Sequence, residues 1–268
     1  MRHTEGESNL SPARTDWIAN NTGGKSGPLL RRDADAFMHQ SLSSPCVNTV
    51  AKAEGIWIED LDGRRYMDFH GNSVHHIGYG HPRLIEAIKK QLDELSFSPR
   101  RFTNEVSVEL AERLGDLASG NLNRVLFTTG GSDAIEVALK IARAATGRFK
   151  TLSFWDAFHG AGFGASAVGG EATFRSHIAG PLVPGAEHVA PFACYRCPYN
   201  HSGPDVCGLA CATMVDYGLE REGDVAAVIA EPMRAVPQVP PPGYWKAVRA
   251  ASGATTERGF IHALTDLV

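Results

Sequence analysis

The sequence predicts an α/β protein whose sheet is mostly parallel. From about residue 100 onward, short apolar strands alternate with longer segments whose apolar residues recur at helical spacing. Strands are expected at 124–128, 150–155 and 225–230, and helices between Asp133 and Gly147, at 212–221 and from near Gly243. Strands that are separated by helices are typical of parallel βαβ units, so we expect an α/β domain in this part of the chain.

Before residue 100 the pattern is different. Residues 1 to about 27 are rich in Ser, Asn, Thr, Gly and Arg with weak periodicity, which is typical of an arm that is disordered on its own. Two alternating runs, Gly55–Asp60 and Arg65–Phe69, flank the pair Asp62-Gly63, which predicts a β-hairpin. Helices are predicted from Pro82, a residue that suits a first helical turn, and over about 104–118.

The composition excludes several classes of protein. The 268 residues carry a net charge of −4 and are 43% hydrophobic, which is typical of a globular protein and excludes a collagenous or disordered one. No apolar run approaches the roughly 20 residues of a membrane helix, and the polar start predicts no signal peptide. The mildly acidic balance argues against a nucleic-acid surface. We therefore expect a cytoplasmic protein that binds neither membranes nor nucleic acids.

A candidate phosphate site lies where a strand passes into a helix, at Thr129-Gly130-Gly131-Ser132-Asp133. The unpaired amides of a helix N-terminus and its macrodipole favour an anion, and glycines allow close approach of the backbone. The alternative is a glycine-rich turn in which Ser132 or Asp133 only caps the helix. The segment is neither a Walker loop nor a complete Gly-x-Gly-x-x-Gly motif, which argues against an ATP or NAD site.

A second candidate stretch, Phe154 to Gly164, follows the next predicted strand. Open α/β sheets bind ligands beyond the carboxyl ends of their strands. Phe158 could stack on a flat heteroaromatic ring there, and the small residues around it would leave room; the alternative is that Phe158 is a core residue.

These motifs together resemble the class III aminotransferases, which are enzymes of aspartate-aminotransferase fold type I that depend on pyridoxal 5'-phosphate (PLP). The order Gly-Gly-Ser-Asp-Ala, an aromatic-His-Gly turn and a strand that ends in Glu231-Pro232 carries the resemblance. Trp57–Phe69 resembles the family's first hairpin, and Gly78–Pro82 resembles its Gly-His-x-His-Pro turn. The resemblance implies a homodimer, a small-molecule amine substrate and a chain divided as 1–30 arm, 31–100 first part of the small domain, 101–250 first part of the PLP-binding domain and 251–268 non-matching tail.

The resemblance assigns six positions to the cofactor: Gly130, Gly131, Ser132, Phe158, His159 and Glu231. Gly131 and Ser132 would hold the phosphate, Phe158 would stack on the pyridine ring with His159 beside it, and Glu231 matches the acidic residue near the cofactor. Two residues depart from the family. Gly130 stands where the family usually has Ser and so lacks a hydroxyl, and Tyr79 replaces the first His of the turn on the substrate side.

Within the family, one branch is most similar. Phe37–Cys46, Asp68–Asn72 and Cys194–Pro198 resemble the branch that releases ammonia from the amino-phosphonate (R)-1-hydroxy-2-aminoethylphosphonate. PLP draws electrons from the α-carbon of a bound amine, after which either elimination or transamination can follow. The sequence leaves lyase and transaminase both open.

Four of the five cysteines form two close pairs: Cys194, Cys197, Cys207 and Cys211. Two such pairs could enclose one tetrahedral zinc ion, and the alternative is free thiols in a loop. The histidines at 70, 75, 76 and 81 do not share one face and are expected to be structural or polar-network residues.

The family's chemistry also needs a lysine that forms a Schiff base and an acidic residue against the pyridine nitrogen. Both come after the Glu-Pro motif, but the seven lysines include only Lys246 beyond Glu231, too early to match. The resemblance stops after Ala250, so we expect 251–268 to be an out-of-frame tail and the 268-residue chain to be an inactive, non-catalytic fragment. Reading the downstream DNA in the other frames tests that expectation.

Overall fold

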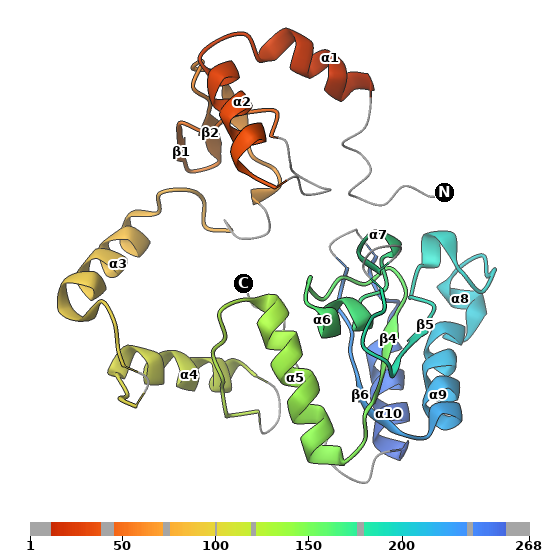
Figure 1. Cartoon of the computed structure of the whole chain (residues 1–268). Coiled ribbons are helices and arrows are strands. Elements are labelled where there is room, and N and C mark those ends of the chain that lie inside the picture. Colours follow the sequence, from red (N-terminus) through yellow and green to blue (C-terminus); the bar gives the residue numbers. More distant parts are fainter. Residues whose placement is uncertain are drawn as a thin grey trace. The chain divides into compact units, whose positions relative to one another are not determined.

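The computed structural model describes residues 12–38, 46–71, 76–99, 101–118, 122–175, 180–234 and 238–255. Its described residues form two compact units, one up to Asn123 and the other from Arg124 onward (Figure 1). The family boundary expected after residue 100 stays a prediction. None of the described helices is both long enough and apolar enough to cross a membrane.

The first unit contains a three-stranded antiparallel sheet in the order β1-β2-β3. Its strands are β1 (Lys52–Glu54), β2 (Trp57–Glu59) and β3 (Arg65–Met67). The predicted hairpin is confirmed, because β2 and β3 pair from Trp57↔Met67 to Glu59↔Arg65. Gly63 has φ +80°, a left-handed conformation that glycine adopts without a steric penalty.

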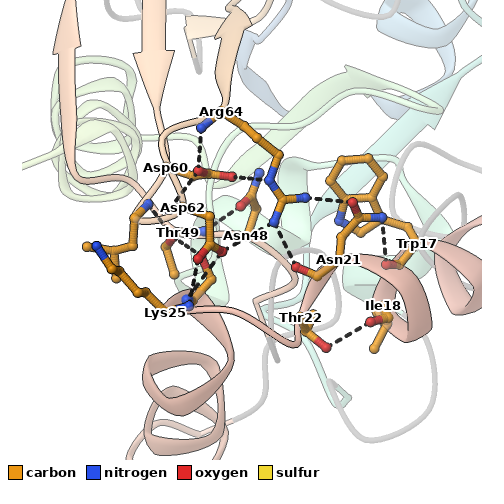
Figure 2. Close-up of polar contacts among 12 residues, drawn as sticks. Trp17, Ile18, Asn21, Thr22, Lys25, Asn48, Thr49, Asp60, Asp62 and Arg64 are labelled. Atoms are coloured by element: carbon orange, nitrogen blue, oxygen red, sulfur yellow. Dashed lines mark hydrogen bonds and ion pairs between the residues drawn. The ribbon is translucent and has the colours of Figure 1, made fainter.

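The polar arm contains α1 (Pro12–Asn21) and the start of α2 (Ser26–Ala36), two helices that the weak sequence periodicity did not predict. The hairpin turn holds this segment by polar contacts (Figure 2). The Arg64 guanidinium donates to the side-chain oxygen of Asn21 at 2.6 Å and to its carbonyl at 3.0 Å. The Asp62 carboxylate accepts from the backbone N–H of Lys25 at 2.6 Å. The order of the arm therefore depends on residues 37 and 43 positions away, and local composition could not reveal it.

Asp60 organises the hairpin turn from within. Its side chain is 0% exposed and lies 3.2 Å from the Arg64 guanidinium. One carboxylate oxygen accepts the backbone N–H groups of Asp62 at 2.9 Å and Arg64 at 2.8 Å, and the other accepts the Tyr66 hydroxyl at 3.0 Å. A buried carboxylate is tolerated here because each of its oxygens is satisfied.

Two amphipathic helices complete the first unit, α3 (Pro82–Leu95) and α4 (Glu105–Leu117). Both were predicted and are confirmed. The Asn104 side chain caps α4 by accepting the backbone N–H of Ser107 at 3.0 Å. The apolar residues of α3 remain exposed by 41–58%: Leu84, Ile85, Ile88, Leu92 and Leu95.

The second unit contains a parallel sheet in the order β5-β4-β6. Its strands are β4 (Lys150–Phe154), β5 (Ala186–Val189) and β6 (Val225–Val228). The predicted parallel α/β architecture is confirmed. The sequence did not reveal β5, because Glu187 and His188 interrupt its apolar pattern.

The strand predicted at 124–128 is wrong: these residues are irregular in the structure. Val125, Leu126 and Phe127 are 38%, 66% and 49% exposed. A strand is stabilised by a hydrogen-bonded neighbour, and no described segment pairs with this one.

Helices cover both faces of the parallel sheet: α5 (Gly131–Thr146), α6 (Phe163–Val168), α9 (Ala210–Glu222) and α10 (Tyr244–Thr255). Two short helices, α7 (Ala172–Arg175) and α8 (Pro204–Cys207), lie in the connecting segments. One buried cluster joins Leu152 and Phe154 of β4 to Val215 of α9 and Val248 of α10. A second cluster joins residues of α5 and α6, namely Ile135, Leu139, Ala165 and Val168. In Figure 1, α5 and α6 lie to one side of β4 and α9 to the other. The end of α5 is set by Gly147, as predicted, at φ +68°.

Candidate functional site

The N-terminus of α5 is open and faces no side-chain cap. Gly130 precedes the helix in an extended conformation, and no side chain forms a cap hydrogen bond there. A Cβ atom placed on Gly130 or Gly131 would meet no heavy atom within 4 Å. The Asp133 carboxylate in the first turn accepts the Thr129 hydroxyl. The unpaired amides of this turn are therefore accessible to an anion, as the phosphate interpretation requires.

The loop that follows β4 lies against this helix end. The Ser132 hydroxyl oxygen accepts the backbone N–H of Ala161 at 3.1 Å, which leaves its own proton available for donation. Gly160 has φ +127°, and a Cβ there would lie 2.9 Å from the Ser132 Cα atom. Only glycine fits at this position, because both the backbone conformation and the contact exclude a side chain.

Glu136 also fixes this loop, although no sequence motif marked it. One of its carboxylate oxygens accepts the backbone N–H groups of Gly164 at 2.8 Å and Ala165 at 2.9 Å. Glu136 lies four residues after Ser132, so the two share a helix face; this spacing was the available signal. The side chains of α5 thus hold the loop at Ala161 and at the start of α6.

Glu231 holds the same loop from the end of β6. Its carboxylate accepts the backbone N–H of Phe158 at 3.0 Å. The Phe158 ring is 46% exposed and packs against Phe174 with 4.8 Å between ring centroids. That exposure does not fit the alternative of a core residue, and it leaves ring surface available for a ligand. The structure therefore brings Ser132, Phe158 and Glu231 together through one loop.

His159 is buried beside this loop. It is 6% exposed, and its Nε2 atom has no hydrogen-bond partner. Burial, together with the positive charges of His188 and Arg234, lowers its pKa to about 4. The imidazole is therefore neutral near pH 7.

A buried arginine that the sequence analysis did not select links Glu231 to a second carboxylate. Arg234 has a side chain only 8% exposed and lies 3.3 Å from Glu171 and 4.0 Å from Glu231. Glu171 follows the loop after β4, whereas Glu231 and Arg234 follow β6. These three charged side chains join the segment after β4 to the segment after β6. Because they are buried, removing one of them would leave the others as uncompensated charges.

The second unit has three lysines, Lys140, Lys150 and Lys246, and none of them contributes a contact described above. Lys140 lies nine residues along α5 from Gly131, roughly 13 Å by helical rise. The Lys150 amine lies 2.8 Å from Glu222, which raises its pKa. Lys246 is exposed on α10. In the described part of this unit, no lysine amine forms a hydrogen bond or ion pair with the loop.

Tyr79, which departs from the family pattern, has a partner within the first unit. Its hydroxyl donates to the Asp68 carboxylate at 2.7 Å. The N–H groups of Gly71 and His70 also reach this carboxylate, and these hydrogen bonds lower the pKa of Asp68 to about 2. Tyr79 therefore fixes Asp68 in its ionised form.

All five cysteines are free thiols. Four of them line one cavity of about 20 Å³, beside Tyr199 and His201: Cys194, Cys197, Cys207 and Cys211. Over the described residues, no three His, Cys, Asp or Glu side chains already stand in an arrangement that could hold a metal ion. Of the four clustered histidines, His75 lies outside the described residues.

Comparison with known proteins assigns the chain to a family. The model of the class III aminotransferases matches residues 39–254. The (R)-1-hydroxy-2-aminoethylphosphonate ammonia-lyase of Vibrio splendidus is 45% identical in an alignment of 260 positions, which covers 92% of this chain and 54% of that protein. The adenosylmethionine-8-amino-7-oxononanoate aminotransferase of Nitratidesulfovibrio vulgaris is 34% identical over 84% of this chain and 40% of its own length.

Solved structures of aminotransferases have a similar fold. The taurine:2-oxoglutarate aminotransferase of Bifidobacterium kashiwanohense, solved with PLP and glutamate, superposes with a TM-score of 0.78 at 30% identity, over 85% of this chain and 54% of that one. A PLP-bound amine transaminase from an uncultivated Pseudomonas species gives 0.74 at 31% identity, over 82% of this chain and 54% of that one. The chain spans about half the length of these relatives. It belongs to the class III aminotransferases and shares the fold of their PLP-dependent members.

Proposed function

We propose that the second unit binds PLP by its phosphate at the start of α5. One observation carries this proposal: the uncapped N-terminus of α5 lies against a loop that is held from two sides. Ser132 and Glu136 of α5 hold the loop from one side, and Glu231 holds it from the other. The amides of Gly131 and Ser132 and the Ser132 hydroxyl are the phosphate donors. Gly130 adds no hydroxyl, so the backbone supplies the contact that a serine would otherwise make.

The remaining predicted residues fit the ring of the same cofactor. The Phe158 side chain offers an exposed aromatic face for stacking, and its backbone is fixed by Glu231. His159 is buried with Nε2 unpartnered, so it can donate to or accept from a group that enters the site. When bound, PLP supplies the electron sink that weakens bonds at the α-carbon of an amine.

We further propose that the enzyme is an ammonia-lyase on a small amino-phosphonate such as (R)-1-hydroxy-2-aminoethylphosphonate. The 45% identity to a lyase of that name, over 92% of this chain, supports this activity over others in the family. The alternative is a transaminase, which the relatives of that class support. Ammonia formed without any 2-oxo acid identifies the lyase, whereas amine loss that requires a 2-oxo acid identifies the transaminase.

A different class of function is a non-catalytic chain that binds PLP without reacting. The positions of Lys140, Lys150 and Lys246 support it for the 268-residue polypeptide. Borohydride reduction of the chain in the presence of PLP is then expected to give no lysine–PLP adduct at the site. A lysine–PLP adduct located by peptide mass spectrometry would contradict this reading.

The exposed apolar face of α3 supports a homodimer, and five unpaired thiols support a reducing, cytoplasmic location. Sedimentation of the chain at several concentrations tests the first of these assignments.

The phosphate site is tested by comparing PLP with pyridoxal, which lacks the phosphate. PLP is expected to bind at least tenfold more tightly by absorbance titration, and inorganic phosphate is expected to compete with it. Ser132→Ala should weaken PLP binding several-fold and leave pyridoxal binding unchanged. Ser107→Ala, at an exposed position on α4, is the matched control. Equal affinities for PLP and pyridoxal would refute the phosphate site.

A further inference from the structure

The four cysteines of the second unit surround one cavity although they come from three separate elements. Cys194 begins a short 3₁₀ helix that Cys197 terminates, Cys207 ends α8, and Cys211 lies in the first turn of α9. The cavity they line measures about 20 Å³. That is close to the space of a single water-sized sphere, so it suits one atom or ion and no larger ligand.

An unusual backbone conformation between α8 and α9 places the thiols of Cys207 and Cys211 at this cavity. Gly208 and Leu209, between α8 and α9, both lie in the left-handed region, with φ +55° and +60°. Leucine rarely adopts this conformation, because its Cβ approaches the following carbonyl oxygen. Non-glycine residues persist there only where the surrounding structure holds them, and such positions cluster at functional sites and ligand clamps. Here the consequence is that Cys207 and Cys211 line the same space as Cys194 and Cys197.

The chemistry of the lining selects the kind of occupant. A water molecule needs two to four good hydrogen-bond partners, and thiols are weak ones. Sulfur ligands are soft, and four of them around a single-ion cavity suit a tetrahedral metal such as zinc. Burial and the neighbouring thiols raise the pKa of Cys194, and burial above all raises that of Cys211 to about 11.

From this arrangement we propose that the cavity binds one Zn²⁺ through the thiolates of Cys194, Cys197, Cys207 and Cys211. Each thiol releases its proton to solvent as one sulfur–zinc bond forms, and no electron is transferred. The side chains do not yet converge on a common point. Binding therefore requires the four side chains to move toward one another, and it ties the segment before α8 to the start of α9. The site is structural, because all four positions are occupied by protein.

The test uses the intact chain, reduced, loaded with Zn²⁺ and desalted. We expect one zinc per chain by elemental mass spectrometry, and Co²⁺ in place of zinc is expected to give the visible absorption of a tetrahedral thiolate complex. Replacing a cysteine from each pair, in Cys197→Ser/Cys207→Ser, should abolish both signals. Cys46→Ser is the matched control, because Cys46 is exposed in the first unit and should leave one zinc bound.

His201 lines the same cavity, so His201→Gln checks the ligand set. We expect it to retain one zinc; loss of the metal would overturn the four-thiolate assignment.

A measurement on the unmodified chain guards against misfolded variants. A thiol reagent should react rapidly with several cysteines of the metal-free chain and with only Cys46 after zinc is added. Zinc below 0.1 per chain after loading, or thiol reactivity that zinc does not change, would overturn the proposal. Disulfides between these cysteines in the chain as isolated would overturn it as well.

Discussion

The carboxylate of Glu231 accepts a hydrogen bond from the backbone N–H of Phe158 at 3.0 Å, although 73 residues separate the two. Glu231 follows β6 and Phe158 follows β4, and these strands are neighbours in the parallel sheet. Because the carboxyl ends of parallel strands meet at one edge, a residue beyond one strand can position the loop beyond another. The aromatic face proposed for the cofactor is thereby fixed from a distant part of the sequence.

Removing the Glu231 carboxylate should release the Phe158 loop. A hydrogen bond to a charged group contributes about 1.5–3 kcal/mol, so Glu231→Ala is expected to speed hydrogen exchange at the Phe158 amide by roughly tenfold or more. Glu231→Gln keeps an acceptor oxygen and should have a smaller effect. Exchange is measured by NMR, with Glu220→Ala on the exposed face of α9 as control. An unchanged Phe158 exchange rate in Glu231→Ala would show that this contact does not hold the loop.

The Glu136 carboxylate should matter for the stability of the second unit. Its replacement by alanine leaves the N–H groups of Gly164 and Ala165 without an acceptor at the start of α6. We expect the free energy of unfolding to fall by about 1–3 kcal/mol in urea titrations. Lys140→Ala, exposed on the same helix, should change it by less than about 0.5 kcal/mol. Equal effects of the two substitutions would mean that the carboxylate is not an anchor.

The buried His159 should make stability depend on pH. Its pKa is lowered to about 4 in the folded chain, from an ordinary value of 6.5, mainly by burial. Between these values the unfolded chain binds the extra proton, so the folded state is favoured above pH 6.5 and loses stability as pH falls toward 4. The loss is expected to reach about 3 kcal/mol.

His159→Gln should flatten this profile, which urea titrations at several pH values would show. His188 contributes in the same direction, because burial and Arg175 lower its pKa as well, so some slope remains. His76→Gln, in the first unit, is the control. If the free energy of unfolding of His159→Gln depends on pH as steeply as that of the wild-type chain, the lowered pKa of His159 is wrong.

The Tyr79 hydroxyl should influence the ionisation of Asp68. Three hydrogen bonds lower the pKa of Asp68 to about 2, those of the Gly71 N–H, the Tyr79 hydroxyl and the His70 N–H. Tyr79→Phe removes one donor, so the Asp68 pKa should rise toward 3.8, as measured by carboxyl NMR titration. Tyr66→Phe removes a hydroxyl that donates to Asp60 and should leave Asp68 unchanged. A constant Asp68 pKa in Tyr79→Phe would contradict the assigned hydrogen bond.

The features that the sequence predicted correctly are those with local causes. The turn at Asp62-Gly63 needs a residue that tolerates positive φ, and Gly147 ends α5 for the same reason. The spacing of apolar residues in the sequence predicted α3 and α4, although these helices leave their apolar faces exposed. Local pattern also selected Ser132 and Phe158, and the family resemblance selected Glu231; that these three residues bind a cofactor stays a prediction.

The errors share a different physical origin. The apolar run 124–128 has the composition of a strand, yet a strand exists only with a neighbour, and no described segment pairs with it. The arm before residue 27 has weak periodicity, yet Arg64 and Asp62 hold it from the hairpin. In both cases the deciding partner is distant in sequence, so a local pattern does not reveal it.

The sequence by itself determined the family and the parallel α/β class, because motif order and hydrophobic period are properties of the chain, and it supplied the residues proposed for the cofactor. Only the tertiary structure decided how those residues are held. It placed Glu136 against the start of α6, joined Glu231 to Phe158, and set Arg234 between two carboxylates. These pairings depend on which strands become neighbours in the sheet, and that is settled by the burial and hydrogen bonding of the whole unit.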